Sequence, residues 1–542
     1  MERDFAYERE DVVKRTVSNY IELGNHFLKP PQVRLVLVSK SPEEKPLGAR
    51  DVAVSTAVQC YASGVAQLKE RRDEKSESIA RSTLAAGHHT TRSHNYFTWQ
   101  IIGATRSVIH DVFHAHPFYN SEQQSQRYVE ARRGNYLVPA ELSPEKRQFF
   151  ESAAYFANQS YFKLLEKLKP VVTERMREMY PEGGFKVEET AYRLDLKTAK
   201  ICQEIARYVL PIGQFTTLYH TLSELQLLRL FRASQMQHFP DEARFIIGKM
   251  IAEVASYDPT FLKELEVPIR DEKKENVGDT YLRSQKENFD RILGGRTSLL
   301  LNREGVDRNV LIMAARNAIT APLTEISDEE ILRLLMSPSR NKLLADVYDI
   351  GMLDPLTSSL RQISLAFATK LSHTADSQRQ RHRMTPGATP TVDMLYDGAP
   401  DYITPLVVRG NPDLKKFYDD TMLKVFANVE KAIEIGIPRE YALLLLPNAL
   451  TVRVVESGDL FDFLHRWKQR LCYLAQEEIF FVSVEQVEQV GEVLPEAVDM
   501  LLAPCGVRKL AGIRPRCPEG ERWCGKPVFN WTIEKYKENR LI

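Results

Sequence analysis

The chain has 542 residues, of which 43% are hydrophobic and 27% are charged, as is usual for a globular protein of about two to four domains. Lys and Arg together number 73, as do Asp and Glu, so the formal net charge is zero. This balance argues against a protein that coats nucleic acid, although a local basic patch can still hold a phosphate. The longest apolar stretch, at 441–450, contains a proline and is too short to span a bilayer.

The amino-terminal residues and the cysteines indicate the compartment. The first residues, MERDFAYERED, are polar and acidic, which excludes a secretory signal. Six cysteines in a chain of this length do not make a disulfide framework. We therefore expect a cytoplasmic protein that has neither a membrane nor a nucleic acid as partner.

Hydrophobic periodicity predicts mostly helix. In chain order, we expect strands at 34–39 and 95–102, helices at 144–168, 190–210, 218–233 and 413–435, and a strand at 478–484. This mixture favours a helix-rich α/β or α+β fold.

Two polar stretches interrupt the predicted elements. The stretch 266–292 is the most charged of the interior, and we interpret it, extended to 266–295, as a linker. The second, 384–400, is rich in Gly and Pro and is either a binding loop or disordered. The resulting organisation is a first domain at 1–265, the linker, a second domain at 296–490 and a cysteine-containing tail at 491–542.

The two halves of the chain share an internal repeat. The first half has NYLVP at 135–139, a long predicted helix, and a segment that ends in Leu210-Pro211. The second half has DYITP at 401–405, a long predicted helix, and a segment that ends in Leu446-Pro447. A charged helical stretch and an acidic turn follow in both halves, and four features in one order favour duplication over coincidence.

The most specific motif lies in the first half. It comprises GHHT at 87–90, YFTW at 96–99, GATR at 103–106 and SEQQSQRYV at 121–129. In this order it resembles the flavin-dependent thymidylate synthases, whose pattern is a GH-x-(S/T) turn, an FTF-like strand, a G-x-(S/T)-R segment, an RHR-x7-S motif and SQRYV. The resemblance spans roughly residues 50–250 and 310–485 and implies two tandem, unequally preserved domains of that family.

Each half lacks motif residues that the other half retains. The first half has His114-Ala115-His116 where the family has Arg-His-Arg. The second half has Arg381-His382-Arg383, with Gln378 at the family's spacing, but it has lost the SQRY end, and Thr391 stands where the motif serine belongs. We therefore expect the loop 384–400 to be mobile without ligand and not to bind the substrate phosphate.

The same complementary loss occurs downstream. The family arginine before Leu-Pro is Arg207 in the first half and Leu443 in the second. A later family arginine is Arg470 in the second half and Ser234 in the first. Random decay would not favour such complementary retention, so the pattern favours a working protein.

A nucleotide monophosphate requires this kind of residue set. Arginine matches phosphate bidentately, and a donor is needed where negative charge collects on the uracil oxygens. The resemblance implies that dUMP binds at a domain boundary and that both halves contribute to one composite site. The substrate-binding candidates are Gln123, Ser125, Arg127, Arg207 and Gln378, and the catalytic candidates are Arg381 and Arg470. The alternative is that these arginines are helix-surface charges or salt-bridge partners.

The resemblance also implies FAD, with His88, Thr90, His382 and Arg383 as candidate contacts. Ser93 replaces the acid that the family places before His94, and Asp459 and Phe461 replace its Asn and Arg flavin contacts.

The expected activity is methylation of dUMP to dTMP with methylenetetrahydrofolate and NADPH, by a homodimer of the fused chain or by a self-sufficient pseudo-dimer. One alternative is a catalytically inactive nucleotide-binding or structural relative. Another is a flavoenzyme that acts on a different pyrimidine.

The tail contains three cysteines, Cys505, Cys517 and Cys524. With Gly and Pro beside them they could bind zinc or an iron–sulfur cluster. They are separated by 11 and 6 residues, without a CxxC pair or an evident fourth ligand. Ordinary buried or free thiols are the alternative, and we assign no metal here.

Overall fold

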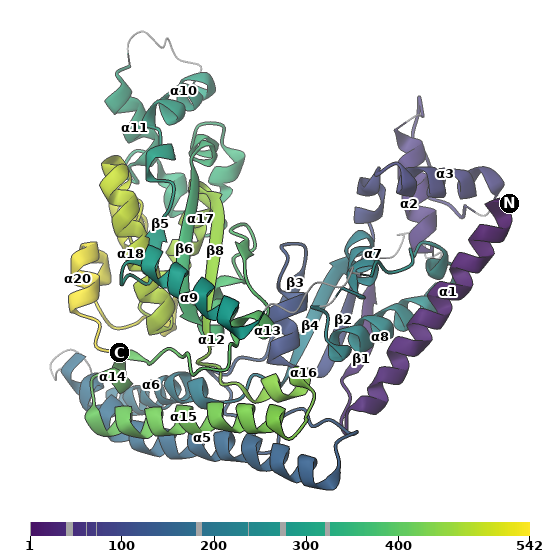
Figure 1. Cartoon of the computed structure of the whole chain (residues 1–542). Coiled ribbons are helices and arrows are strands. Elements are labelled where there is room, and N and C mark those ends of the chain that lie inside the picture. Colours follow the sequence, from purple (N-terminus) through teal and green to yellow (C-terminus); the bar gives the residue numbers. More distant parts are fainter. Residues whose placement is uncertain are drawn as a thin grey trace.

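The computed structural model describes residues 2–39, 47–60, 62–71, 73–179, 187–236, 238–270, 278–319 and 326–542. Two sheets stand in separate arms above a base of long helices (Figure 1). The base is formed by α5 (Pro144–Met179), α6 (Val187–Ala206) and α15 (Pro412–Glu434). Within the described ranges, no helix combines the length and the apolar character needed to cross a membrane.

The first sheet has four antiparallel strands in the order β1-β2-β4-β3. Alternate residues of β2 and β4 are buried, because one face of the sheet packs on the core. The helices α1 and α8 pack on each other, and α8 packs on β1. The elements of this arm are α1 (Glu2–Glu22), β1 (Gln32–Val38), α2 (Ala49–Gln59), α3 (Glu74–Ala85), β2 (Tyr96–Thr105), α4 (Arg106–Val108), β3 (Asn120–Gln123), β4 (Phe215–Ser223), α7 (Glu224–Ala233) and α8 (Asp241–Tyr257).

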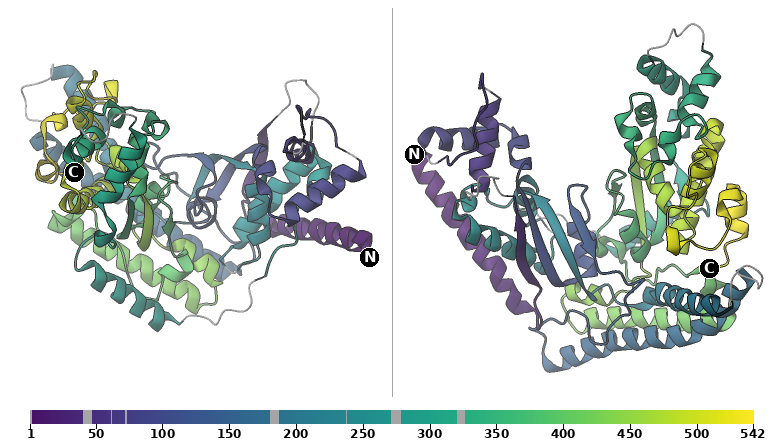
Figure 2. Two further views of the ribbon diagram at one scale, coloured as in Figure 1. Left: turned by 90° about the horizontal axis from the view of Figure 1, so that it is seen from above. Right: turned by 180° about the vertical axis from the view of Figure 1, so that it is seen from behind.

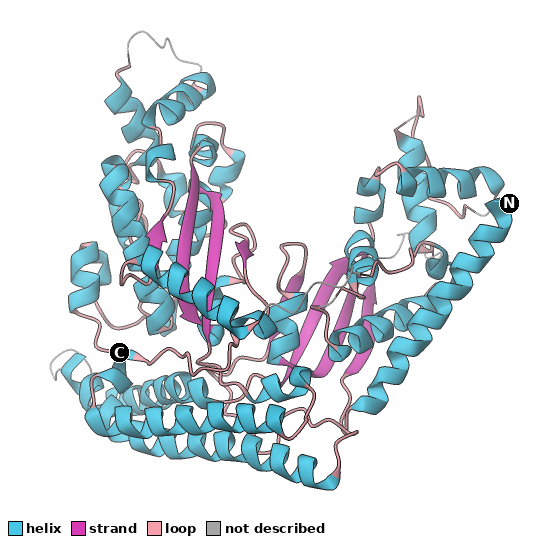
Figure 3. Cartoon of the chain, in the orientation of Figure 1, coloured by secondary structure: helices cyan, strands magenta, loops and turns pink. Residues whose placement is uncertain are grey.

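The second sheet has the order β5-β6-β8-β7 and is also antiparallel. The helix α18 packs on β5 and β6 (Figure 3). The remaining elements are α9 (Asp279–Leu293), β5 (Ser298–Leu300), α10 (Arg308–Ala318), α11 (Asp328–Met336), β6 (Ser364–Ser372), α12 (His373–Arg379), β7 (Gly387–Ala388), α13 (Val392–Leu395), α14 (Leu406–Arg409), α16 (Arg439–Ala442), β8 (Thr451–Asp459), α17 (Leu460–Arg470), α18 (Glu477–Val493), α19 (Pro504–Leu510) and α20 (Ile533–Glu538).

The two sheets are repeats of one topology. Strand β5 corresponds to β1, β6 to β2, β8 to β4 and β7 to β3, and each sheet is followed by two helices, α7 and α8 or α17 and α18. Strands β4 and β8 both have nine residues, and helices α8 and α18 both have seventeen. The helix-rich α/β fold and the tandem duplication predicted from the sequence are therefore confirmed.

Two predicted elements are wrong. Residues 478–484, predicted as a strand, lie in α18, because a short apolar run does not distinguish a buried strand from a buried helix. The predicted helix at 218–233 begins as strand β4 and becomes helix α7 only at Glu224, where Ser223 caps the helix by accepting from the Gln226 N–H. The other predicted strands correspond to β1 and β2, and the other predicted helices to α5, α6 and α15.

The two polar stretches also carry structure. Within the charged stretch 266–292, α9 packs its Asp290 against Arg453 of β8 and Lys370 of β6, with the nearest oxygen–nitrogen distance 2.7 Å in each pair. Within the loop 384–400, β7 pairs with β8, and the Val392 N–H donates to Asp111 of the first half at 3.0 Å.

A continuous apolar core joins the halves. The core beneath the first sheet includes Leu443, Leu445 and Leu450 of the second half. A separate core lines α5, α6 and α15 at the base, where the views from above and from behind also place these helices together (Figure 2). The halves therefore fold against each other as an integral pair, as two subunits of an obligate dimer would.

Candidate active site

The junction between the halves has approximate twofold symmetry. Pro211 and Pro447, which close the two repeated Leu-Pro segments, form an antiparallel bridge with each other. The Ile212 N–H donates to the Leu446 carbonyl at 2.8 Å, and the Asn448 N–H donates to the Leu210 carbonyl at 2.8 Å. A segment that pairs with its own repeat lies on a twofold axis, as in an isologous dimer interface.

A matched pair of carboxylates, Glu242 buried and Glu478 partly buried, flanks this axis. Glu242 accepts from the Thr105 N–H at 2.7 Å and from its hydroxyl at 2.5 Å, where β2 ends and α4 begins. Glu478 accepts from the Ser372 N–H at 2.5 Å and from its hydroxyl at 2.6 Å, where β6 ends and α12 begins. Burial raises the pKa of Glu242 to about 7 and also raises that of Glu478. Glu478 thus holds the start of the segment that carries the RHR motif in the second half. Glu242 holds the start of the corresponding first-half segment, which carries His114-Ala115-His116.

Gln476 is a point of contact between the halves. Its Oε1 accepts hydrogen bonds from Arg207 of the first half and from Gln378 of the second. Its amide nitrogen donates to the Tyr208 hydroxyl, and Tyr208 in turn donates to Glu478. The structure thus brings together two of the predicted substrate-binding residues, Arg207 and Gln378, through a residue that the sequence analysis did not select.

Arg127 and Arg470 approach the same region from opposite halves. Arg127 donates to Glu204 and, across the junction, to the Leu474 carbonyl at 2.6 Å. Arg470 donates to His382 at 2.9 Å and to the Gln378 carbonyl at 3.0 Å. Burial first, and then the positive charges of Arg127 and Arg381, lower the pKa of Arg470 to about 9. Such repulsion requires the guanidinium groups to lie near one another.

Arg106 joins this cluster, although the sequence analysis did not select it as a site residue. Its pKa is lowered to about 9 by burial and by the positive charges of Arg207 and Arg381. It donates to the Gln124 carbonyl at 2.7 Å, which ties it to the SEQQSQRYV segment. The GATR motif that contains it was the signal for its role. We call Arg106, Arg127, Arg207, Arg381 and Arg470 the arginine cluster.

Arg381 is the most accessible member of the cluster. It is exposed, and among the described residues its side chain has no hydrogen bond or ion pair. Two further polar atoms near the cluster, Nε of Arg106 and Oε1 of Gln378, are buried and have no hydrogen-bond partner among the residues that the structure describes. Buried polar atoms normally have partners, so these groups suit a polar ligand.

The remaining substrate candidates lie on the β3 side. Gln123 is the last residue of β3, opposite Leu218 of β4, and is partly buried. The Ser125 hydroxyl accepts from the Arg127 N–H at 3.1 Å and so shapes the turn that presents Arg127.

Of the cofactor candidates, His382 and Arg383 lie near the junction between the halves, and His88 and Thr90 lie away from it. His382 is buried against Arg470, and Arg383 donates to Asn120 of the first half at 2.7 Å and lies 5.5 Å from the Tyr119 ring centre. His88 and Thr90 are exposed and precede β2, whereas Arg106 follows it. Ten residues of strand span about 30 Å, so this chain does not bring His88 and Thr90 to the arginine cluster.

A cavity of about 350 Å³ opens on the first sheet and receives Arg383 from the second half. Ser93, where the family has an acid, lies on its wall. Ser223 and Leu225, the first-half counterparts of Asp459 and Phe461, also line it. The other lining residues are Tyr96, Pro117, Phe118, Tyr119, Asn120, Thr221, Gln226 and Arg229.

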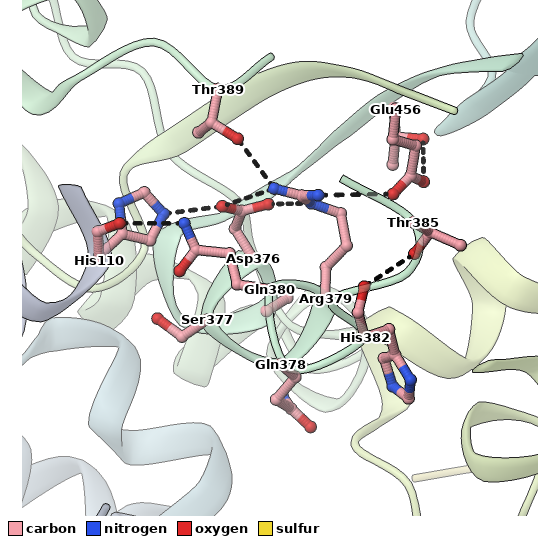
Figure 4. Close-up of polar contacts among 12 residues, drawn as sticks. His110, Asp376, Ser377, Gln378, Arg379, Gln380, His382, Thr385, Thr389 and Glu456 are labelled. Carbon is pink, nitrogen blue, oxygen red and sulfur yellow. Dashed lines mark hydrogen bonds and ion pairs between the residues drawn. The ribbon is translucent and has the colours of Figure 1, made fainter. Parts of the chain in front are cut away.

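A buried ion network around Asp376 connects the halves (Figure 4). Asp376 of α12 accepts from His110 of the first half at 2.7 Å and from Arg379 at 2.5 Å. Burial lowers the pKa of His110, but Asp111 and Asp376 outweigh it and raise that pKa to about 9. Burial likewise opposes ionisation of Asp376, yet Arg379 and His110 hold its pKa well below the usual range. The network is therefore charged at neutral pH.

The family model described as thymidylate synthase complementing protein matches residues 44–260 and 301–496, which together exceed half of the chain. The chain therefore belongs to this family and contains its domain twice.

Several relatives each align with less than half of this chain. The flavin-dependent thymidylate synthase of Clostridium tetani is 27% identical over 236 residues, 43% of this chain and 85% of the relative. That of Geobacter sulfurreducens is 24% identical over 239 residues, 43% and 86% of the respective chains. That of Nitratidesulfovibrio vulgaris is 32% identical over 180 residues, 31% and 71%.

Among solved structures, the UMP/dUMP methylase PolB from Streptomyces cacaoi bound with 5-Br dUMP is similar with a TM-score of 0.30 and 19% identity. The similarity covers 43% of this chain and 93% of PolB.

Proposed function

We propose that this chain is a flavin-dependent thymidylate synthase that methylates dUMP to dTMP with methylenetetrahydrofolate and NADPH, at one composite site built from both halves. The observation that carries the proposal is the arginine cluster. Arg127 and Arg207 come from the first half and Arg381 and Arg470 from the second, yet their charges act on one another. Like charges at close quarters are costly without an anion, so the cluster is best explained as the cradle of an anionic substrate.

In this proposal, Arg127 and Arg207 hold the phosphate of dUMP. Both guanidinium groups are already oriented, by Glu204 and by Gln476 respectively, so little side-chain entropy is lost on binding. Arg381 and Arg470 lie toward the uracil, where a cationic donor stabilises the negative charge that develops as C5 becomes nucleophilic. Gln378, tied to Gln476, and the SEQQSQRYV residues Gln123 and Ser125 complete the substrate contacts.

The cavity on the first sheet suits FAD. Its wall combines aromatic rings, which can stack on a flavin or an adenine, with Arg229 and Arg383, which can pair with a pyrophosphate. Both arginines are already held over rings, Arg229 over Phe118 at 5.4 Å and Arg383 over Tyr119 at 5.5 Å. When bound, FAD would supply the hydride that converts the transferred one-carbon unit to a methyl group. The protein's own residues orient the substrate and the arginines that contact it.

Tritium release tests the activity directly, because methylation replaces the hydrogen at C5 of the uracil ring. The purified chain is incubated with FAD, NADPH, methylenetetrahydrofolate and dUMP labelled with tritium at C5. We expect release from the wild type, and Kd values for dUMP about 10- to 100-fold weaker for Arg127→Ala and Arg470→Ala, since charge-assisted contacts contribute about 1.5–3 kcal/mol each.

The matched control is Arg291→Ala, which removes an exposed arginine of α9. Unchanged dUMP affinity in both cluster variants would contradict the composite site. A chain that binds dUMP but neither takes up FAD nor releases tritium would instead be an inactive nucleotide-binding relative. Release from labelled UMP but not from dUMP would identify a different pyrimidine substrate.

A further inference from the structure

The structure supplies a fourth cysteine to the three of the tail. Cys472 lies in the turn between α17 and α18, more than 30 residues before Cys505. Cys472, Cys505, Cys517 and Cys524 all line one small cavity, whose other walls are mostly apolar or aromatic side chains and include Glu519. All six cysteines of the chain lie within the described residues, and none of them forms a disulfide bond.

The four thiols lie close enough to influence one another. Burial first, and then the other three cysteines, raise the pKa of the Cys505 thiol to about 12. The pKa of Cys472 is likewise raised to about 12, by burial and then by Cys524, Glu519 and Cys517. A coordinating metal deprotonates its thiol ligands, so four thiols on one cavity can become four thiolate ligands when a metal is bound.

We propose that Cys472, Cys505, Cys517 and Cys524 ligate a [4Fe–4S] cluster. Four thiolates are the ligand set of such clusters. Within the described ranges, no three His, Cys, Asp or Glu side chains converge as ligands of a single metal ion. A [4Fe–4S] cluster carries each cysteine ligand on a different iron, so it does not require the four sulfurs to meet at one ion.

The cluster would fasten the tail to the loop that serves the candidate active site. Cys472 lies two residues after Arg470 and four before Gln476, and the carbonyl of Leu474 accepts from Arg127. The tail already contacts this loop, because Arg540 donates to the Ala475 carbonyl at 2.5 Å and lies 4.3 Å from the Phe480 ring centre. Tyr473 likewise donates to the Tyr536 carbonyl at 2.7 Å. The iron–sulfur cluster would thus hold the loop that carries Arg470 and Gln476 in position.

Metal and sulfide analysis of the full chain, purified without oxygen, tests the proposal independently of any activity. We expect about four iron and four acid-labile sulfide per chain. Each of the variants Cys472→Ser, Cys505→Ser, Cys517→Ser and Cys524→Ser should lose most of the iron. Cys60→Ser and Cys202→Ser, which remove an exposed and a buried cysteine outside the cavity, should retain it.

The wild-type measurement decides the matter even where a variant fails to fold. Wild-type protein that is folded by circular dichroism and carries neither iron nor sulfide, even after anaerobic reconstitution with iron and sulfide, would overturn the proposal. About one zinc per chain without sulfide would also overturn it in favour of a single-ion site. Iron that survives all four cysteine substitutions would show that the metal is bound elsewhere.

Discussion

Replacing Asp376 with asparagine tests how firmly the two halves are joined. The Asp376 carboxylate is fully buried and accepts from His110 of the first half at 2.7 Å and from Arg379 at 2.5 Å (Figure 4). Asparagine preserves the shape but removes the charge. His110 and Arg379 would then remain as buried cations, with Asp111 at 2.8 Å as the remaining counter-charge of His110 and Glu456 at 3.6 Å as that of Arg379.

The expected cost follows from the burial of the whole network. Breaking a buried ion pair by removing one partner typically costs about 3–5 kcal/mol. Each cation here keeps a second carboxylate, so we expect a cost at the lower end of this range. At roughly 2 °C per kcal/mol for a large folding unit, the thermal unfolding midpoint should fall by about 5–10 °C at pH 7.

The loss of thermal stability in Asp376→Asn should also depend on pH. The pKa of His110 is raised from 6.5 to about 9 in the folded protein, so its charge adds stability that is complete below pH 6.5 and is lost as the pH rises through 9. A pKa shift of this size corresponds to about 3 kcal/mol of folding free energy from the charged form of His110, to which the interactions with Asp376 and Asp111 both contribute. The neighbouring His373 ring, 4.2 Å away, has a pKa well below 6.5 and stays neutral in this range. The difference between variant and wild type should therefore narrow between pH 7 and about 10.

Differential scanning calorimetry across this pH range measures the effect. Asp420→Asn is the matched control, because Asp420 pairs with Lys416 on the surface and its loss should barely move the midpoint. A midpoint for Asp376→Asn within about 1 °C of the wild type would refute the reasoning, as would a deficit that stays constant from pH 7 to 10.

Three further predictions concern the junction and the assembly. Gln476→Ala should raise the Kd for dUMP about tenfold, because Arg207 and Gln378 both lose the hydrogen bond that orients them. The control Gln67→Ala, which changes an exposed glutamine, should leave the Kd unchanged, and equal affinities of the two variants in a calorimetric titration would contradict this. Thr105→Val and Ser372→Ala should each cost about 1–3 kcal/mol, the former more, since Glu242 loses its hydroxyl donor whereas Glu478 keeps that of Tyr208; melting points unchanged in both would count against the matched carboxylates. In sedimentation equilibrium the chain should have about twice its 62.2 kDa mass, and a monomer at all concentrations would mean that the two halves suffice alone.

Much of the fold could be predicted from local pattern. Alternation in 95–102 predicted β2, and the 3.6-residue period predicted α5 and α15, because each period reflects one buried face. The segments 478–484 and 218–223 were mispredicted, because the packing partner of a short apolar run, and not the run itself, decides between helix and strand. The repeat of Leu-Pro segments predicted the duplication that the two sheets display.

The sequence by itself determined which residues each half had kept. The order of GHHT, GATR and SEQQSQRYV, with RHR in the other half, was enough to select Arg127, Arg207, Gln378 and Arg470.

Only the tertiary structure decided which of these residues meet. Gln476 meets Arg207 across 269 residues of chain, and the charge of Arg381 acts on Arg106 from the other half, and no local period reaches that far. His88 and Thr90 share the motif of Arg106 but lie at the other end of a ten-residue strand. Cys472 joins the tail cysteines in the same way, because folding sets the distance between residues and sequence separation does not.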